Sequence, residues 1–180
     1  MKYRIIASII IFQFLILKIG MPQSTKIIVD TNALINQAKE MGQSFMKSDF
    51  STFMKYTYPK VIQMMGGKSK MTTLLKQGLA KMKSDGYEFK SLDIELTSLF
   101  VTAGSELHSL VRQRIVMTVP GGTLLTDSYL LAITLNTGKD WFFVDTAPLH
   151  DKNTLTSLFP NYNQELKIPR KQPPVFNEQR

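Results

Sequence analysis

The chain has 180 residues and contains no cysteine. This absence excludes disulfide bonds, thiolate metal sites, cysteine nucleophiles and the lipid anchor of a bacterial lipoprotein, which is attached to a cysteine. The sequence also lacks the N-x-[ST] sequon, which fits a bacterial envelope better than a eukaryotic secretory route. Without disulfides the fold must depend on its hydrophobic core, and a content of 43% hydrophobic residues is sufficient for one domain.

Histidine is scarce, with His108 predicted on a strand and His150 in a loop. A zinc site would need both of them together with carboxylates, and their spacing does not suggest one. We therefore expect no metal site and no cofactor. Alternation places His108 on the polar side of its strand with Arg112 and Arg114, so we expect both histidines at the surface, with His108 facing solvent or a partner.

The first residues differ from the rest of the chain. Lys2 and Arg4 precede a largely apolar run at residues 5–17, a pattern typical of a secretory signal peptide, here assigned to residues 1–24. The run is shorter than the roughly 20 residues that a spanning helix needs. No A-x-A cleavage motif follows it. The sequence predicts an exported protein, periplasmic or secreted, with the alternative that an uncleaved N-terminal segment holds it at the inner membrane.

Charge is unevenly distributed around a net value of +8. Residues 47–90 hold nine lysines against three acidic residues, whereas residues 91–166 hold four basic against eight acidic residues. Nucleic-acid binding requires basic residues interleaved with aromatics on a platform, and the predicted strands are net acidic, so we expect no nucleic-acid partner. Membrane contact is expected only through an uncleaved signal or the basic tail at residues 167–180.

Helical periodicity dominates the first half of the chain. Apolar residues recur every three or four positions over residues 31–47, with Asp30 or Thr31 as the N-cap. A short helix capped by Ser48 or Asp49 follows and is interrupted by Pro59. After a further turn or two, the pattern predicts a helix over residues 69–83.

After the helices the apolar period changes to two. Long strands are predicted over residues 87–100, 105–119, 123–135 and 141–145, with a tight turn at residues 120–122. A short helix is predicted over residues 152–159, and residues 167–180 are predicted to be an extended or disordered tail. The order predicts an α+β fold in one domain, residues 27–160, with the N-terminal helices packed on a curved antiparallel sheet.

Helices followed by hairpin-linked strands, the last reading "DWFFVD", resemble the NTF2-like superfamily, a cone-shaped α+β fold. The stretch "FMKSDFSTFMKYTYPKVIQMMGG" is also similar to small exported Bacteroidota proteins of unknown function. The resemblance covers roughly residues 30–150. It implies a curved sheet around a cavity that helices close, used by members for isomerisation, dehydration, hydrolysis or ligand binding. Some members form dimers through the sheet, so the fold alone does not assign a function.

Five side chains are candidates for lining such a cavity: Tyr56, Tyr58, Asp127, Tyr129 and Trp141. Asp127 lies among apolar residues of its strand, surroundings that would raise its pKa and suit a general acid or base acting with Tyr129. The alternative is that Asp127 lies near the hairpin in solvent and has no chemical role.

The sequence is best interpreted as an exported NTF2-like domain without catalytic activity, a module of the bacterial envelope that binds a small apolar ligand or another protein. An isomerase- or hydratase-like enzyme that uses Asp127 and Tyr129 is the alternative, and a homodimer formed through the sheet is a third. Asp145, which follows the apolar run of the last strand, is predicted to end that strand and to accept hydrogen bonds from the turn.

Overall fold

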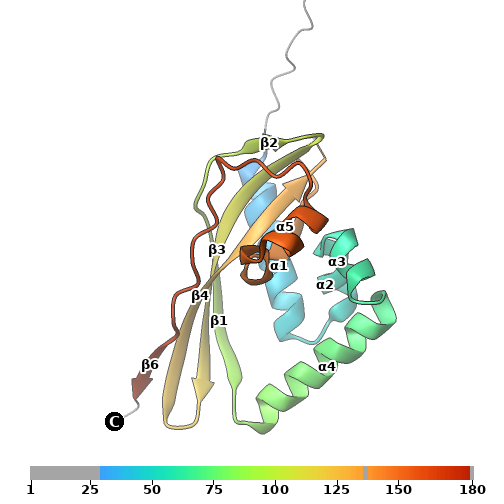
Figure 1. Cartoon of the computed structure of the whole chain (residues 1–180). Coiled ribbons are helices and arrows are strands. Elements are labelled where there is room, and N and C mark those ends of the chain that lie inside the picture. The colour runs from blue at the N-terminus through green and yellow to red at the C-terminus, as the bar shows by residue number, and fades with distance from the viewer. Residues whose placement is uncertain (1–28, 136–137, 179–180) are drawn as a thin grey trace, which may run out of the picture.

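The computed structural model describes residues 29–135 and 138–178, so the signal-peptide prediction for residues 1–24 lies outside the described residues. Four helices come first, and strands follow (Figure 1). The helices are α1 (Thr31–Met46), α2 (Phe50–Tyr56), α3 (Pro59–Met64) and α4 (Lys68–Ser84). The strands are β1 (Glu88–Leu96), β2 (Val101–Ala103), β3 (Glu106–Val119), β4 (Gly122–Thr134), β5 (Phe142–Asp145) and β6 (Val175–Glu178). Between β5 and β6 lie the 3-10 helix η1 (Ala147–His150) and α5 (Lys152–Leu158).

The predicted helix starts are confirmed by side-chain caps. Asp30 accepts a hydrogen bond of 3.0 Å from the amide of Ala33, and Asp49 accepts one of 3.1 Å from the amide of Thr52. Asp151 caps α5 in the same way. Each carboxylate satisfies an amide that has no partner within its own helix, so each start is defined by local sequence.

The sheet is antiparallel, with the strand order β1-β3-β4-β5. β2 also pairs with β3, and β6 pairs with β4. The long central hairpin β3–β4 runs in unbroken register from Leu107 opposite Thr134 to Val119 opposite Gly122. The sheet is curled but does not close on itself, and the molecule is the α+β fold with leading helices that the sequence predicted.

The alternation in β1 is interrupted by a bulge. Phe89 lies opposite Met117 and Ser91 opposite Val116, so the register shifts across Lys90. Strict alternation would place Phe89 and Leu92 on different faces. The extra residue of the bulge returns Phe89 to the face of Leu92, where both side chains line the same cavity.

Both faces of the sheet are covered in its upper part as drawn in Figure 1. On one face α1 packs against the strands through the core residues Leu34, Ala38, Met41, Tyr56, Ile94, Leu107, Val111, Leu130, Ala132, Trp141 and Phe143. On the other face a second core contains Tyr58, Leu110, Leu131, Ile133, Val144, Leu149, Leu158, Phe159 and Leu166. This double cover explains why the last strand is apolar on both sides, a feature of its sequence.

The C-terminal segment extends the domain beyond the predicted boundary at residue 160. Leu166 is buried in the second core, and the side-chain amide of Asn163 donates to the carbonyl of Thr102 in β2. The chain then returns along the sheet to β6, whose Val175 lies opposite Leu125 (Figure 1). Part of the tail that was predicted as extended or disordered is therefore an edge strand, and all four of its residues are exposed.

Candidate functional site

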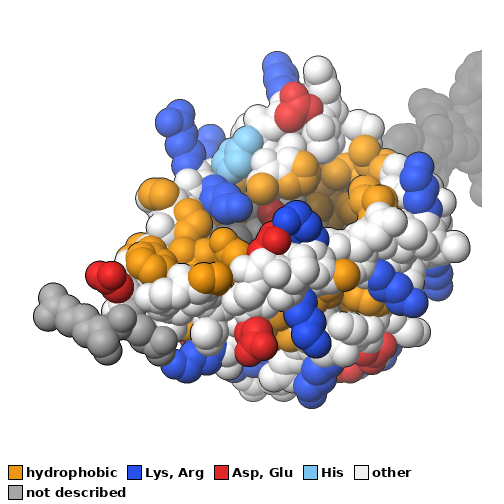
Figure 2. All heavy atoms as spheres, turned by 90° about the horizontal axis from the view of Figure 1, so that it is seen from below, with side chains coloured by type: hydrophobic (Ala, Val, Ile, Leu, Met, Phe, Trp, Pro, Cys, Tyr) orange, Lys and Arg blue, Asp and Glu red, His pale blue; other side chains and the backbone are white. Residues whose placement is uncertain are grey.

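An apolar cavity of about 260 Å³ lies between the helices and the sheet. Its lining comes from helices α1 to α4 and from strands β1, β3, β4 and β5. The lining residues are Met41, Gly42, Phe45 and Met46 of α1, Phe53 of α2, Thr57 after α2, Val61 of α3, Met71 of α4, Phe89 and Leu92 of β1, Gln113 and Ile115 of β3, Leu130 of β4, and Phe143, Val144 and Asp145 of β5. Figure 2, a view from below, shows apolar side chains gathered around a hollow, with lysine and arginine around them. Most of the lining can offer only dispersion and hydrophobic contact.

Aromatic rings form one wall of this cavity. The ring of Phe45 lies 5.4 Å from that of Phe53 and 5.9 Å from that of Phe89, both measured between centroids. The second pair meets edge to face, the arrangement that ring quadrupoles favour. Because α1, α2 and β1 each contribute one ring, the wall exists only in the folded protein.

The side chain of Asp145 both holds the turn after β5 and lines the cavity. Its Oδ1 accepts a hydrogen bond of 2.7 Å from the amide of Ala147, so the prediction that it ends β5 and holds the turn is confirmed. It also lines the cavity together with Thr57 and Gln113, which are the polar members of the described lining. The cavity is therefore apolar except for these side chains.

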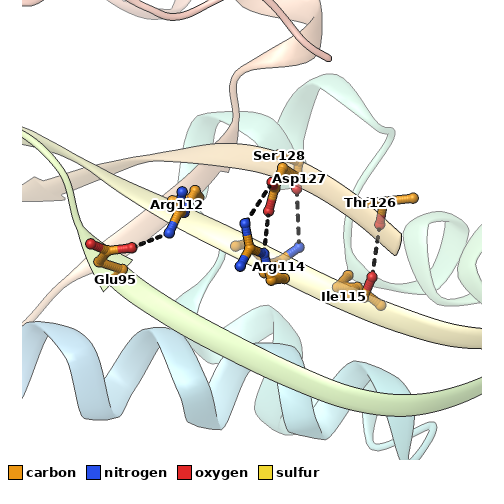
Figure 3. A network of polar contacts seen from close by, with 8 residues as sticks. Glu95, Arg112, Arg114, Ile115, Thr126, Asp127 and Ser128 are labelled. Atoms are coloured by element: carbon orange, nitrogen blue, oxygen red, sulfur yellow. Dashed lines mark hydrogen bonds and ion pairs between the residues drawn. The ribbon is translucent and has the colours of Figure 1, made fainter. Parts of the chain in front are cut away.

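Asp127 lies on the other face of the sheet. It is opposite Arg114 in the β3–β4 register and pairs with it, accepting from Nε at 3.0 Å and from a terminal guanidinium nitrogen at 3.1 Å (Figure 3). This guanidinium holds the pKa of Asp127 below its ordinary value, in the opposite direction to the shift expected from its apolar neighbours. A carboxylate held ionised by an arginine is a poor general acid.

Three further residues that the sequence suggested as cavity-lining lie in different surroundings. Tyr56 donates to Glu40 at 2.7 Å, and burial raises its pKa to about 12. Tyr129 lies opposite Arg112 on the face of Asp127, and Trp141 is 1% exposed in the first core, with its indole N–H donating to the carbonyl of Gly138. The structure therefore brings Asp127 and Tyr129 to one face, and neither lines the described part of the cavity wall.

The surface prediction for His108 is wrong, although that for His150 is confirmed. His108 is 0% exposed because α5 and the segment after it cover this half of the polar face of β3. Its ring meets that of Phe159 edge to face, with 5.4 Å between centroids. One feature of the sequence indicated this burial: Leu110 is an apolar residue on the same face of β3 as His108.

His108 belongs to a polar cluster that sequence reasoning missed. Glu106 accepts from the hydroxyl of Tyr58 at 2.7 Å and lies 3.0 Å from Nε2 of His108. Burial lowers the pKa of His108, and the Glu106 carboxylate opposes this shift, so the ring is neutral and donates through Nε2. Nδ1 has no hydrogen-bond partner among the described residues. The cluster joins Tyr58, the N-cap residue of α3, to β3 beneath the C-terminal segment.

This cluster makes the stability of the protein dependent on pH. The pKa of His108 is lower in the folded chain than its ordinary value of 6.5, so the unfolded chain binds the proton more readily. The stability that the neutral ring contributes is complete well above pH 6.5 and is lost as the pH falls through this value toward the lower pKa of the folded chain. We expect the free energy of unfolding, from urea titrations, to fall between about pH 7.5 and about pH 5.5.

Two variants identify the residue responsible. His108→Phe should flatten this dependence, because the titrating ring is removed. His150→Gln should leave it unchanged, because His150 is exposed. An unchanged slope in His108→Phe would assign the effect to another group.

Comparison of the chain with protein-family models, curated proteins and solved structures finds no match. Among the described residues, no group of histidine and acidic side chains is arranged to hold a metal ion. The same residues include no helix that is both long enough and apolar enough to span a membrane. Function must therefore be inferred from the cavity itself.

Proposed function

We propose that this protein is a non-catalytic binding module of the bacterial envelope that holds a small apolar ligand in the cavity between its helices and its sheet. This proposal rests on the presence of the cavity. Its volume of about 260 Å³ is a little below the roughly 300–1,000 Å³ of pockets for drug-sized ligands, so the ligand is small. The envelope assignment rests on the signal-peptide pattern of residues 1–24.

The residue types in the lining support binding rather than catalysis. Asp145 is the one titratable side chain in the described lining, and general acid–base chemistry normally requires a second such group within reach. Asp127 and Tyr129, on which the isomerase- or hydratase-like alternative depends, lie on the other face of the sheet. The arrangement therefore gives that alternative no pair of groups facing a common substrate.

Membership of the NTF2-like superfamily is part of the same proposal. Leading helices, a curled antiparallel sheet and a cavity between them are the features that the resemblance implied. The cavity also favours a ligand-binding module over a purely structural interaction module, whose interior would be filled by side chains.

A cavity-filling substitution tests the proposal. An uncharged naphthylamine dye, whose fluorescence rises in apolar surroundings, should bind the protein and be displaced by apolar compounds. Ile115→Trp places a large ring in the cavity and should weaken dye binding at least about tenfold. The measurement is a fluorescence titration, with circular dichroism to verify folding.

Val116→Trp is the matched control. Val116 is the next residue of β3 and faces the opposite side of the sheet, so the same substitution there leaves the cavity open. It should bind the dye as the parent protein does. Equal binding by all three proteins would place the dye outside the cavity and refute the proposal.

A further inference from the structure

A second hollow adjoins the apolar cavity. Its volume is about 570 Å³, and it lies between the second half of α4 and the chain around the start of β1. Met46 and Phe89 line both spaces, so the two meet at these side chains. Figure 1 shows α4 running away from α3 toward the start of β1.

The hollow differs from the cavity in its polarity. Leu79 and Met82 give it an apolar floor that continues the cavity. Lys76 and Lys83 also line it, against one acidic residue, Glu88, so its charge is net positive. Among the described residues no ion pair neutralises either lysine, whereas Lys81 of the same helix is paired with Asp85 at 2.7 Å.

Helix α4 is suited to border an entrance to the apolar cavity. Of its residues only Met71 is buried, while Leu74 remains 42% exposed. Few buried contacts hold α4 against the rest of the fold, and segments of this kind open at low free-energy cost. A ligand that enters beneath α4 would pass the two lysines first and reach the apolar cavity beyond Met46 and Phe89.

We propose that the ligand is a single-chain amphiphile with an anionic head group. Its hydrocarbon chain occupies the cavity, and its head group lies in the hollow beside Lys76 and Lys83. This inference rests on the proposed function, because it assigns the ligand of the same cavity. It adds the sign of the head group, which the cavity lining by itself does not determine.

Affinities for head groups of different charge on the same chain test this inference. Decanoate, decyl phosphate, decanol and decylammonium are titrated against the bound naphthylamine dye at low salt. Decanoate and decyl phosphate should displace the dye at lower concentration than decanol, and decylammonium should be the weakest. Raising the salt concentration should reduce the advantage of the two anions and leave decanol unchanged. A preference for only one of the anions identifies the head group as carboxylate or phosphate.

Charge-neutralising variants show which lysines cause the preference for an anionic head group. The double variant Lys76→Gln/Lys83→Gln should weaken decanoate binding about threefold to tenfold, a modest loss because both lysines are exposed. It should leave decanol binding unchanged, because decanol carries no charge. Glu88→Gln should strengthen decanoate. Lys68→Gln/Lys70→Gln is the matched control: it makes the same change in net charge on the same helix, at exposed residues outside the hollow.

The outcomes separate this inference from the proposed function. If the dye does not bind, or Ile115→Trp does not weaken it, the proposed function fails. If the dye and decanol bind in the cavity but decanoate has no advantage, only the anionic head group is refuted. An equal loss in both lysine double variants also refutes it, because the effect is then one of overall charge.

Discussion

Replacing Trp141 with alanine is expected to lower the free energy of unfolding by about 3–5 kcal/mol. The indole is 1% exposed and lies 5.8 Å from the ring of Phe100, and its N–H donates to the carbonyl of Gly138. Alanine would leave a void in the first core, and the carbonyl of Gly138 would keep only its hydrogen bond from the amide of Asp30. Urea unfolding followed by circular dichroism measures the loss, since the variant has no tryptophan fluorescence.

Leu99→Ala is the control for this substitution. Leu99 is 84% exposed, so its removal should change stability by no more than about 0.5 kcal/mol. If Trp141→Ala cost less than about 1 kcal/mol, the indole would not be part of the closed core. Trp141 would then return as the cavity-lining residue that the sequence suggested.

Replacing Glu106 with leucine is expected to cost about 2–5 kcal/mol of stability, because two buried donors lose their acceptor. These donors are the hydroxyl of Tyr58 and Nε2 of His108. Glu106→Gln should cost less than about 1 kcal/mol. Its amide oxygen can still accept from Tyr58, and its amide nitrogen can donate to the ring once the histidine adopts its other neutral tautomer. Urea unfolding at neutral pH compares the two variants.

A double-mutant cycle separates the hydrogen bond from simple loss of packing. Tyr58→Phe removes one of the two stranded donors, so Glu106→Leu should cost less in that background than alone. Fully additive losses would show that Tyr58 and Glu106 do not interact in solution. Equal losses in Glu106→Leu and Glu106→Gln would show that the charge, rather than the acceptor, stabilises the cluster.

Local elements were predictable because local interactions define them. Asp30, Asp49 and Asp151 each cap a helix through an amide three residues further along the chain. Pro59 begins a new helix because its ring fixes φ near the helical value and it has no N–H that would need a partner. The turn after Asp145 is likewise a contact over two residues. β2 and β6 were missed because short edge strands depend on the neighbour they pair with.

The candidate site was less predictable, as Asp127 illustrates. Alternation correctly grouped Asp127 with Tyr129 and Leu131 on one face of β4. It could not show that the cavity lies against the other face, where Leu130 is. Nor could it show that Arg114 lies directly opposite Asp127, because a cross-strand neighbour depends on register.

The order of helices and strands, the helix caps, and the grouping of residues on the faces of β3 and β4 follow from the sequence alone. Periodicity and capping are properties of a few consecutive residues, so they can be read without knowing the fold. What each face packs against depends on the tertiary structure: the bulge in β1 places Phe89 in the cavity wall, and the C-terminal segment buries His108. Burial and pKa depend on contacts between residues far apart in the chain, and these exist only after folding.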